Sequence, residues 1–122
     1  MREEFNKKYS FLKSSIFQGL VWCFWHTLLW VVDSEFTDLR AIPYIISNIV
    51  VITSITVLMN IFLEKNNNLI YSVLLHFGFN IIYVFLTADI MFFVILTIIY
   101  LIVIPVAVVI RNRTIKTKII TK

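Results

Sequence analysis

The sequence predicts an all-α, polytopic membrane protein with about four transmembrane helices in a single domain that spans residues 1–122. Hydrophobic residues make up 60% of the 122 residues, and the mean hydropathy is +0.90. Charged residues make up only 15% of the chain, too few to cover the surface of a soluble domain of this length. Four apolar segments each approach the roughly 20 residues that a helix needs to cross a bilayer.

The four predicted helices cover residues 11–32, 41–63, 69–87 and 90–110. The first follows a basic start, as a signal peptide would, but its apolar part is too long and no small-residue cleavage site follows it. The second lies between the polar segments 33–40 and 64–68, and the third ends at the short connection 88–89. The fourth leads into a basic tail, 111–122. Connections this short make neighbouring helices antiparallel.

The positions of the cations predict the orientation of the chain in the membrane. With four spans, Arg40 alone faces one side, and ten of the eleven Lys and Arg residues face the other. These ten are Arg2, Lys7, Lys8, Lys13, Lys65, Arg111, Arg113, Lys116, Lys118 and Lys122. Cytoplasmic loops carry such an excess, so we expect a multi-pass plasma-membrane protein with both termini in the cytoplasm.

The net charge of +4 therefore reports topology and contact with lipid, and we expect no nucleic-acid partner. The basic tail either binds anionic lipid, at about 1 kcal/mol per cation near the surface, or stays solvated and only sets the orientation.

Two histidines lie inside predicted spans. His26 follows Trp22 by four positions on the first helix, and His76 precedes Asn80 by four positions on the third, so each pair shares a helix face. Ser72 lies on the same face as His76. Ionisable groups at membrane depth are costly and mark functional sites, and imidazole is the commonest metal ligand in proteins.

The first and third helices run in parallel, so side-by-side packing would bring His26 and His76 together. Their depths differ, because His26 lies about 22 Å along its span and His76 about 10 Å along its own. Helix tilt would have to close this gap.

The sequence leaves two interpretations of the histidine pair open. A catalytic zinc takes three protein ligands, and the spans supply two imidazoles and no carboxylate, with Asn80 able to add an amide oxygen or to bind an oxyanion. Alternatively, both histidines are hydrogen-bonded in the core of the helical bundle. Cys23 lies three positions from His26 and is interpreted as packing. Gly78 either allows a close approach of helices or is ordinary packing.

The two motifs resemble those of the CPBP intramembrane metalloproteases, the CAAX- and bacteriocin-processing (Abi) family. The aromatic residue and histidine at Trp22 and His26 are similar to the second family motif, and His76 and Asn80 are similar to the third. The resemblance implies that His26 and His76 hold zinc, that Asn80 supports the oxyanion and that Trp22 shapes the cavity. Activated water would then cleave a peptide bond near or within the membrane.

The first family motif, a pair of glutamates followed by arginine, is not clearly present. Glu3 and Glu4, with Lys8 in place of arginine, imitate it. However, Glu3 precedes His26 by only 23 positions, whereas family members place the pair on an earlier helix. We therefore expect a chain that resembles the C-terminal half of such a protease and lacks its general base.

The expected partners are a peptide or protein substrate at the membrane, the lipid bilayer, and either a second copy of the chain or a complementing N-terminal fragment. The first functional hypothesis is the metalloendopeptidase. The alternative is a catalytically inactive, truncated family member that acts as an immunity-type or partner-binding membrane protein, for example in bacteriocin immunity. A transporter or channel is disfavoured, because the spans contain few Gly or Pro breaks and no acidic residue for proton coupling.

Overall fold

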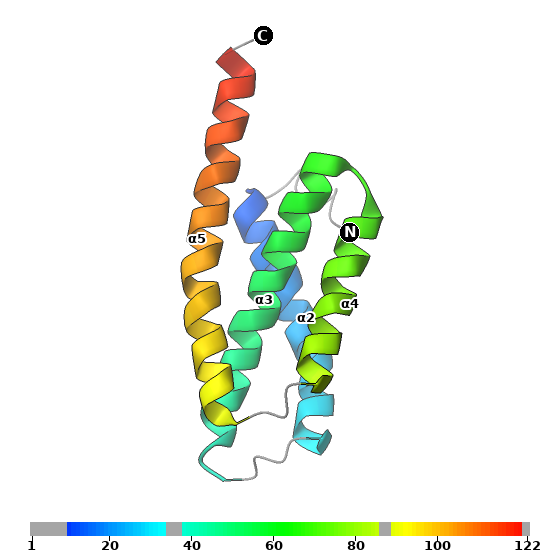
Figure 1. Ribbon diagram of the computed structural model, residues 1–122, viewed down its shortest axis with the longest axis vertical. Coiled ribbons are helices and arrows are strands. Elements are labelled where there is room, and N and C mark those ends of the chain that lie inside the picture. Colours follow the sequence, from blue (N-terminus) through cyan, green and yellow to red (C-terminus); the bar gives the residue numbers. More distant parts are fainter. Residues whose placement is uncertain (1–9, 34–37, 86–88, 121–122) are drawn as a thin grey trace.

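A computed structural model describes residues 10–33, 38–85 and 89–120, and this part of the chain forms four helices (Figure 1). With the labels of Figure 1 they are α2 (Phe11–Asp33), α3 (Ala41–Asn66), α4 (Leu69–Phe85) and α5 (Ile90–Ile120). No strand occurs within the described ranges. The predicted all-α fold is confirmed, and each helix begins at the predicted residue.

Two of the described helices are long and apolar enough to cross a membrane. These are α3 and the Ile90–Thr117 part of α5, whose most apolar stretches of 18 residues have mean hydropathies of 2.1 and 3.1. In α4 the apolar stretch Leu69–Ile81 is shorter. The apolar character of α5 ends at Ile110, but the helix continues through the basic segment, because Arg and Lys are good helix formers, and it extends beyond the rest of the bundle (Figure 1).

Helix α3 lies at the centre of the bundle and packs against each of α2, α4 and α5 (Figure 1). Small residues make its contact with α2 unusually close. Ser15, Gly19 and Cys23 recur every four positions on α2 and are buried. A Cβ built on Gly19 would lie 2.7 Å from the Cα atom of Thr53, so only glycine fits there. This is the small-residue spacing that lets membrane helices approach closely.

Cys23 belongs to this α2–α3 interface. Its Sγ atom lies 3.6 Å from the carbonyl oxygen of Ile49 and 3.8 Å from Thr53 Oγ1. The thiol is 4% exposed and does not line the cavity that contains the histidines. Its position agrees with the interpretation of Cys23 as a packing residue.

The contact between α3 and α5 combines a buried hydroxyl with aromatic packing. Ser47 Oγ donates a hydrogen bond to the carbonyl oxygen of Phe93 (2.7 Å) and lies 2.6 Å from Thr97 Oγ1. Tyr44 meets the ring of Phe93 edge to face, with 4.9 Å between the centroids. Polar contacts of this kind hold apolar helices together where lipid surrounds them.

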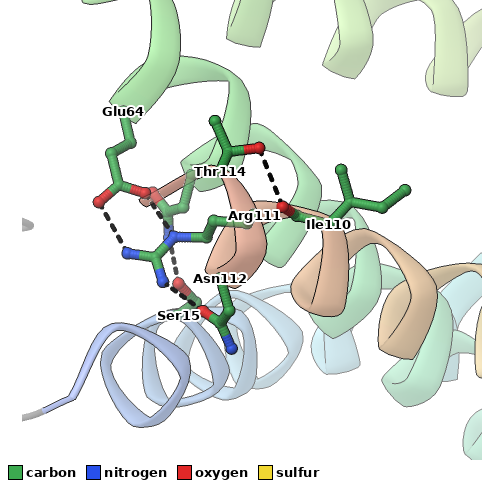
Figure 2. A network of polar contacts seen from close by, with 7 residues as sticks. Ser15, Glu64, Ile110, Arg111, Asn112 and Thr114 are labelled. Atoms are coloured by element: carbon green, nitrogen blue, oxygen red, sulfur yellow. Dashed lines mark hydrogen bonds and ion pairs between the residues drawn. The ribbon is translucent and has the colours of Figure 1, made fainter. Parts of the chain in front are cut away.

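An ion pair joins the end of α3 to α5. Arg111 donates two hydrogen bonds to the carboxylate of Glu64, and the bond from Nη2 to Oε1 is 2.7 Å long (Figure 2). Asn112 Oδ1 accepts a further hydrogen bond from Arg111. The guanidinium also lies 3.7 Å from the ring centroid of Phe11, at the start of α2. One residue thus connects three helices at this end of the bundle.

The turn between α3 and α4 reverses the chain within a few residues. Asn67 adopts the left-handed conformation, with φ of 46°, and its N–H group donates to the carbonyl oxygen of Leu63. Asn68 Oδ1 then accepts a hydrogen bond from the N–H group of Ile70, in the first turn of α4. Asparagine tolerates the left-handed region better than most residues, and such side-chain caps satisfy the free amides at a helix start.

Helix α4 is packed more loosely than α2. Among the described helices, its backbone lies close to that of α3 alone. No atom lies within 4 Å of a Cβ built on Gly78, so the interpretation of Gly78 as a point of close helix approach is wrong. This residue instead lines a cavity of about 280 Å³ between α3, α4 and α5. A glycine allows two helices to approach closely only where it faces the backbone of another helix. Gly78 faces open space instead.

Candidate functional site

The four sequence-predicted site residues line one cavity of about 110 Å³ between α2, α3 and α4. We call it the histidine cavity. Its walls are formed by two residues of α2, three of α3 and three of α4: Trp22, His26, Asn48, Ile52, Ile55, His76, Phe79 and Asn80. The structure therefore places His26, His76, Asn80 and Trp22 together, although 50 positions separate the two histidines along the chain.

His26 is held in one tautomer by the backbone of its own helix. Its Nδ1 atom lies 2.8 Å from the carbonyl oxygen of Trp22. Because a carbonyl can only accept, Nδ1 carries the proton, and Nε2 carries the lone pair in the neutral ring. A hydrogen bond from the second ring nitrogen to a carbonyl is also the usual way in which metal-ligating histidines are oriented.

Trp22 is in contact with both imidazoles. Its indole stacks on His76, with 4.8 Å between ring centroids and 20° between ring planes. It also meets the ring of His26 edge to face at 5.9 Å. The difference in depth between the two histidines is therefore accommodated by Trp22, which precedes His26 by one turn and reaches His76 on the neighbouring helix.

His76 also contacts Asn80, one turn further along α4. Asn80 Nδ2 lies 3.1 Å from His76 Nε2, a distance at which the amide donates to the ring nitrogen. Asn80 is exposed, and His76 is partly buried beneath Trp22. An exposed amide can rotate, so this contact leaves Asn80 free to donate to a bound ligand instead.

Sequence reasoning missed Asn48. This residue of α3 lines the histidine cavity and is 2% exposed. Its Nδ2 atom donates a 2.9 Å hydrogen bond to the carbonyl oxygen of Tyr44. An asparagine inside an apolar run at membrane depth is itself a signal of function, but a search centred on ionisable residues passes over it.

Two residues of the cavity, His26 and His76, are suitable ligands for a zinc ion. Imidazole nitrogen is a normal zinc donor. Metal-ligating histidines commonly donate the N–H of their other ring nitrogen to a backbone carbonyl, as His26 does to Trp22. Within the described ranges, no cluster of three or more His, Cys, Asp or Glu residues could complete the site. Glu3 and Glu4 lie outside the described residues.

A sequence model of the type II CAAX prenyl endopeptidase Rce1-like family matches residues 1–82, about two thirds of the chain. The matched region contains Trp22, His26, His76 and Asn80. No curated protein and no solved structure matches the chain. The family match confirms the resemblance to the CPBP proteases and makes this a membrane protein of an endopeptidase family. The chain belongs to the type II CAAX prenyl endopeptidase Rce1-like family.

Proposed function

We propose that the chain is a membrane-embedded metalloendopeptidase of the CAAX- and bacteriocin-processing type, which cleaves a peptide bond near or within the membrane. One observation carries this proposal: both imidazoles and the amide of Asn80 line one cavity in a chain of an endopeptidase family. A zinc ion held there by His26 and His76 would supply Lewis-acid polarisation of the peptide carbonyl and an activated water.

The four site residues predicted from the sequence then have defined tasks. The hydrogen bond of His26 to the backbone selects the tautomer in which Nε2 of the neutral ring carries the lone pair, and the indole of Trp22 stacks on the ring of His76. Asn80 leaves Nε2 of His76 by rotating and donates its N–H to the oxyanion that develops on the substrate carbonyl.

Apart from Asn48, the remaining walls of the cavity are apolar. Ile52, Ile55 and Phe79 limit the access of water from the α3 and α4 sides. In a medium of low polarity, a hydrogen bond to a developing charge is worth more than it is in water.

The general base is the missing component. No carboxylate of the described residues lines the histidine cavity. General-base assistance commonly contributes about 10²–10⁴ in rate. The proposed activity therefore requires a glutamate from residues outside the described ranges, from a second copy of the chain or from another polypeptide.

We also propose that all four helices cross the plasma membrane. Helix α4, with 17 residues, is about 25 Å long and lies at the lower limit for a span. The end of the bundle that carries Lys13, Lys65 and Arg111 would face the cytoplasm, and Arg40 would lie on the other side. Both termini would then be cytoplasmic.

The test is the zinc content of the full chain, purified in detergent and shown to be helical, compared with His26→Ala and His76→Ala. We expect about one zinc per chain, lost in both variants. Thr27→Ala and Phe77→Ala are matched controls, because these residues are next to the histidines and do not line the cavity; they should keep the metal. Cleavage of labelled membrane peptides, with and without a supplied Glu-Glu fragment, then tests the activity.

A folded wild-type chain without zinc would contradict the metalloendopeptidase proposal. In that case the second candidate takes its place: a non-catalytic family member that binds a partner in the membrane, in the manner of an immunity protein. The observation that favours this second candidate is that the described lining of the cavity combines imidazoles and amides without an acid.

A further inference from the structure

A second and larger cavity adjoins the histidine cavity. It has a volume of about 580 Å³ and lies between α2 and α4, with α3 as its floor. We call it the α2–α4 groove. Its lining includes Trp22 and Trp25 of α2, Met59 and Asn60 of α3, and Leu69 and Ser72 of α4. Trp22 lines both cavities, so the two spaces are neighbours. The volume is within the range of binding pockets for small ligands.

Ser72 gives the groove an unsatisfied polar group. Its hydroxyl is buried, and the residue is only 5% exposed. Within the described part of the chain, Ser72 Oγ has no hydrogen-bond partner. Most serine hydroxyls at membrane depth bond to their own helix or to a neighbour. Ser72 is a lining residue of the groove, and a bound group that reaches its hydroxyl would supply the missing hydrogen bond.

A prearranged polar network joins α2 to the floor of the groove. Asn60 Nδ2 donates to Ser15 Oγ (3.0 Å) and to Gln18 Oε1 (3.2 Å), and Gln18 Nε2 lies 3.4 Å from Ser14 Oγ. Asn60 is 7% exposed, so this network is held inside the bundle. Both bonds of Asn60 use its nitrogen, which leaves the amide oxygen able to accept a hydrogen bond from a ligand.

The rest of the lining is apolar. Val21, Met59, Leu63 and Leu69 would accept aliphatic side chains, and Trp25 would accept flat or branched ones. An alkyl chain would also fit such walls, but it would leave the hydroxyl of Ser72 unpaired. An extended peptide brings N–H and C=O groups that themselves need partners in an apolar setting. Polar groups on the α4 side and on the floor of the groove therefore favour a peptide main chain over a lipid tail.

We propose that the α2–α4 groove binds an extended, apolar segment of the peptide substrate through its main chain, with Ser72 and Asn60 as hydrogen-bonding partners. The proposal rests on the proposed endopeptidase function in one respect, which is that the cleaved bond lies in the histidine cavity. Ser72 and His76 are four positions apart on α4, or about 6 Å along the helix. Since an extended chain advances about 3.3 Å per residue, Ser72 would bind the substrate about two residues from the cleaved bond.

The experiment uses the full chain in nanodiscs with EDTA, so that neither zinc nor cleavage is needed for binding. The probes are blocked hexapeptides composed of Leu, Val, Ala and Phe, each with a dansyl group. All three tryptophans lie on α2, and Trp22 and Trp25 line the groove, so energy transfer from tryptophan to dansyl reports occupancy. We expect saturable binding of at least one of these peptides.

The decisive variant is Ser72→Ala. Loss of one hydrogen bond should weaken peptide binding about 2- to 12-fold. The stability of the protein should be unchanged, because the hydroxyl has no partner among the described residues. Ser54→Ala is the matched control, a buried serine of α3 that does not line the groove; it should bind as the wild type does. Met59→Trp, which fills the groove, should abolish binding.

Equal peptide affinity of Ser72→Ala and the wild type would overturn the proposal. So would tight binding of a dansyl-labelled alkyl chain that displaces the peptide and is unaffected by Ser72→Ala. The two proposals fail separately. If the protein lacks zinc but shows Ser72-dependent peptide binding, the groove proposal stands and the metalloendopeptidase proposal fails. If the protein holds zinc but binds no peptide in the groove, the metalloendopeptidase proposal stands and the groove proposal fails.

Discussion

His26 and His76 face the same cavity from helices that are packed very differently. On the side of His26, α2 lies so close to α3 that a single added carbon at Gly19 would collide with the backbone at Thr53. On the side of His76, the glycine at position 78 has open space around it. The histidine cavity is thus formed between a helix held in place by close packing and one that has room to move.

The three cavities described above also lie beside α4, although α3 borders all of them and α2 borders two. The spaces of about 110, 280 and 580 Å³ are each bordered by residues of α4. Lipid is as apolar as the helix surfaces, so helices in a membrane are held by close packing and hydrogen bonds and not by hydrophobic burial. The backbone of helix α4 lies close to that of α3 alone among the described helices, so α4 is held by less close packing and fewer hydrogen bonds. We infer that α2 fixes one histidine and that movement of α4 would adjust the other when a substrate binds.

The largest expected effect comes from a matched pair of glycine substitutions. Gly19→Ala should lower the free energy of unfolding by about 1–3 kcal/mol, because the backbone of Thr53 can give way only if the two helices separate. Gly78→Ala should raise it by up to about 1 kcal/mol, because alanine favours the helix and meets no neighbour. Urea unfolding in micelles, followed by far-UV circular dichroism, measures both. Equal effects would contradict the division into a tight and a loose side.

A pair of buried serines provides the second test. Ser47→Ala should lower the free energy of unfolding by about 1 kcal/mol, because it removes a hydroxyl bonded to Phe93 and Thr97 between α3 and α5. Ser72→Ala should leave the free energy of unfolding unchanged or raise it slightly, because the hydroxyl of Ser72 has no partner among the described residues. The same unfolding measurement applies. A substantial loss of stability in Ser72→Ala would show that α4 is held by a contact that the structure does not contain.

The third test concerns the ion pair at the end of the bundle. Arg111→Gln should lower the free energy of unfolding by about 1 kcal/mol, since it removes two hydrogen bonds to Glu64 and the contact with the ring of Phe11. Arg113→Gln, an exposed neighbour, is the control and should have little effect. Because α4 takes no part in these contacts, the hydrogen exchange of its amides should be the same in both variants. Faster exchange confined to α4 would contradict this.

The smallest effect is expected at the start of α3. The side chain of Arg40 hydrogen-bonds to Asp38 and lowers the pKa of this carboxyl group. A carboxyl whose pKa is lowered by folding contributes stability above its unfolded pKa of about 4, and this contribution is lost as the pH falls through the lowered value. Between about pH 5 and pH 3, wild type should therefore lose slightly more stability than Asp38→Asn. Both residues are exposed, so parallel pH profiles would mean that solvent screens the pair fully.

Much of this protein follows from local properties of its sequence. Hydropathy and length predict four helices, because burial in lipid depends on each segment by itself. The spacing of His26 after Trp22, and of Asn80 after His76, places each pair on one helix face, because helix geometry repeats every 3.6 residues. The match of residues 1–82 to the endopeptidase family agrees with this reading of the motifs.

The contacts between helices were decided only by the tertiary structure. Gly19 and Gly78 look equivalent in the sequence, yet only Gly19 faces another backbone. Likewise, Asn48 reads as one polar residue in an apolar run, and Trp22 as one of three tryptophans, until folding places both around the two imidazoles. Such roles depend on tilt and rotation of one helix against another. These are set by close packing over many residues, and no local pattern in the chain specifies them.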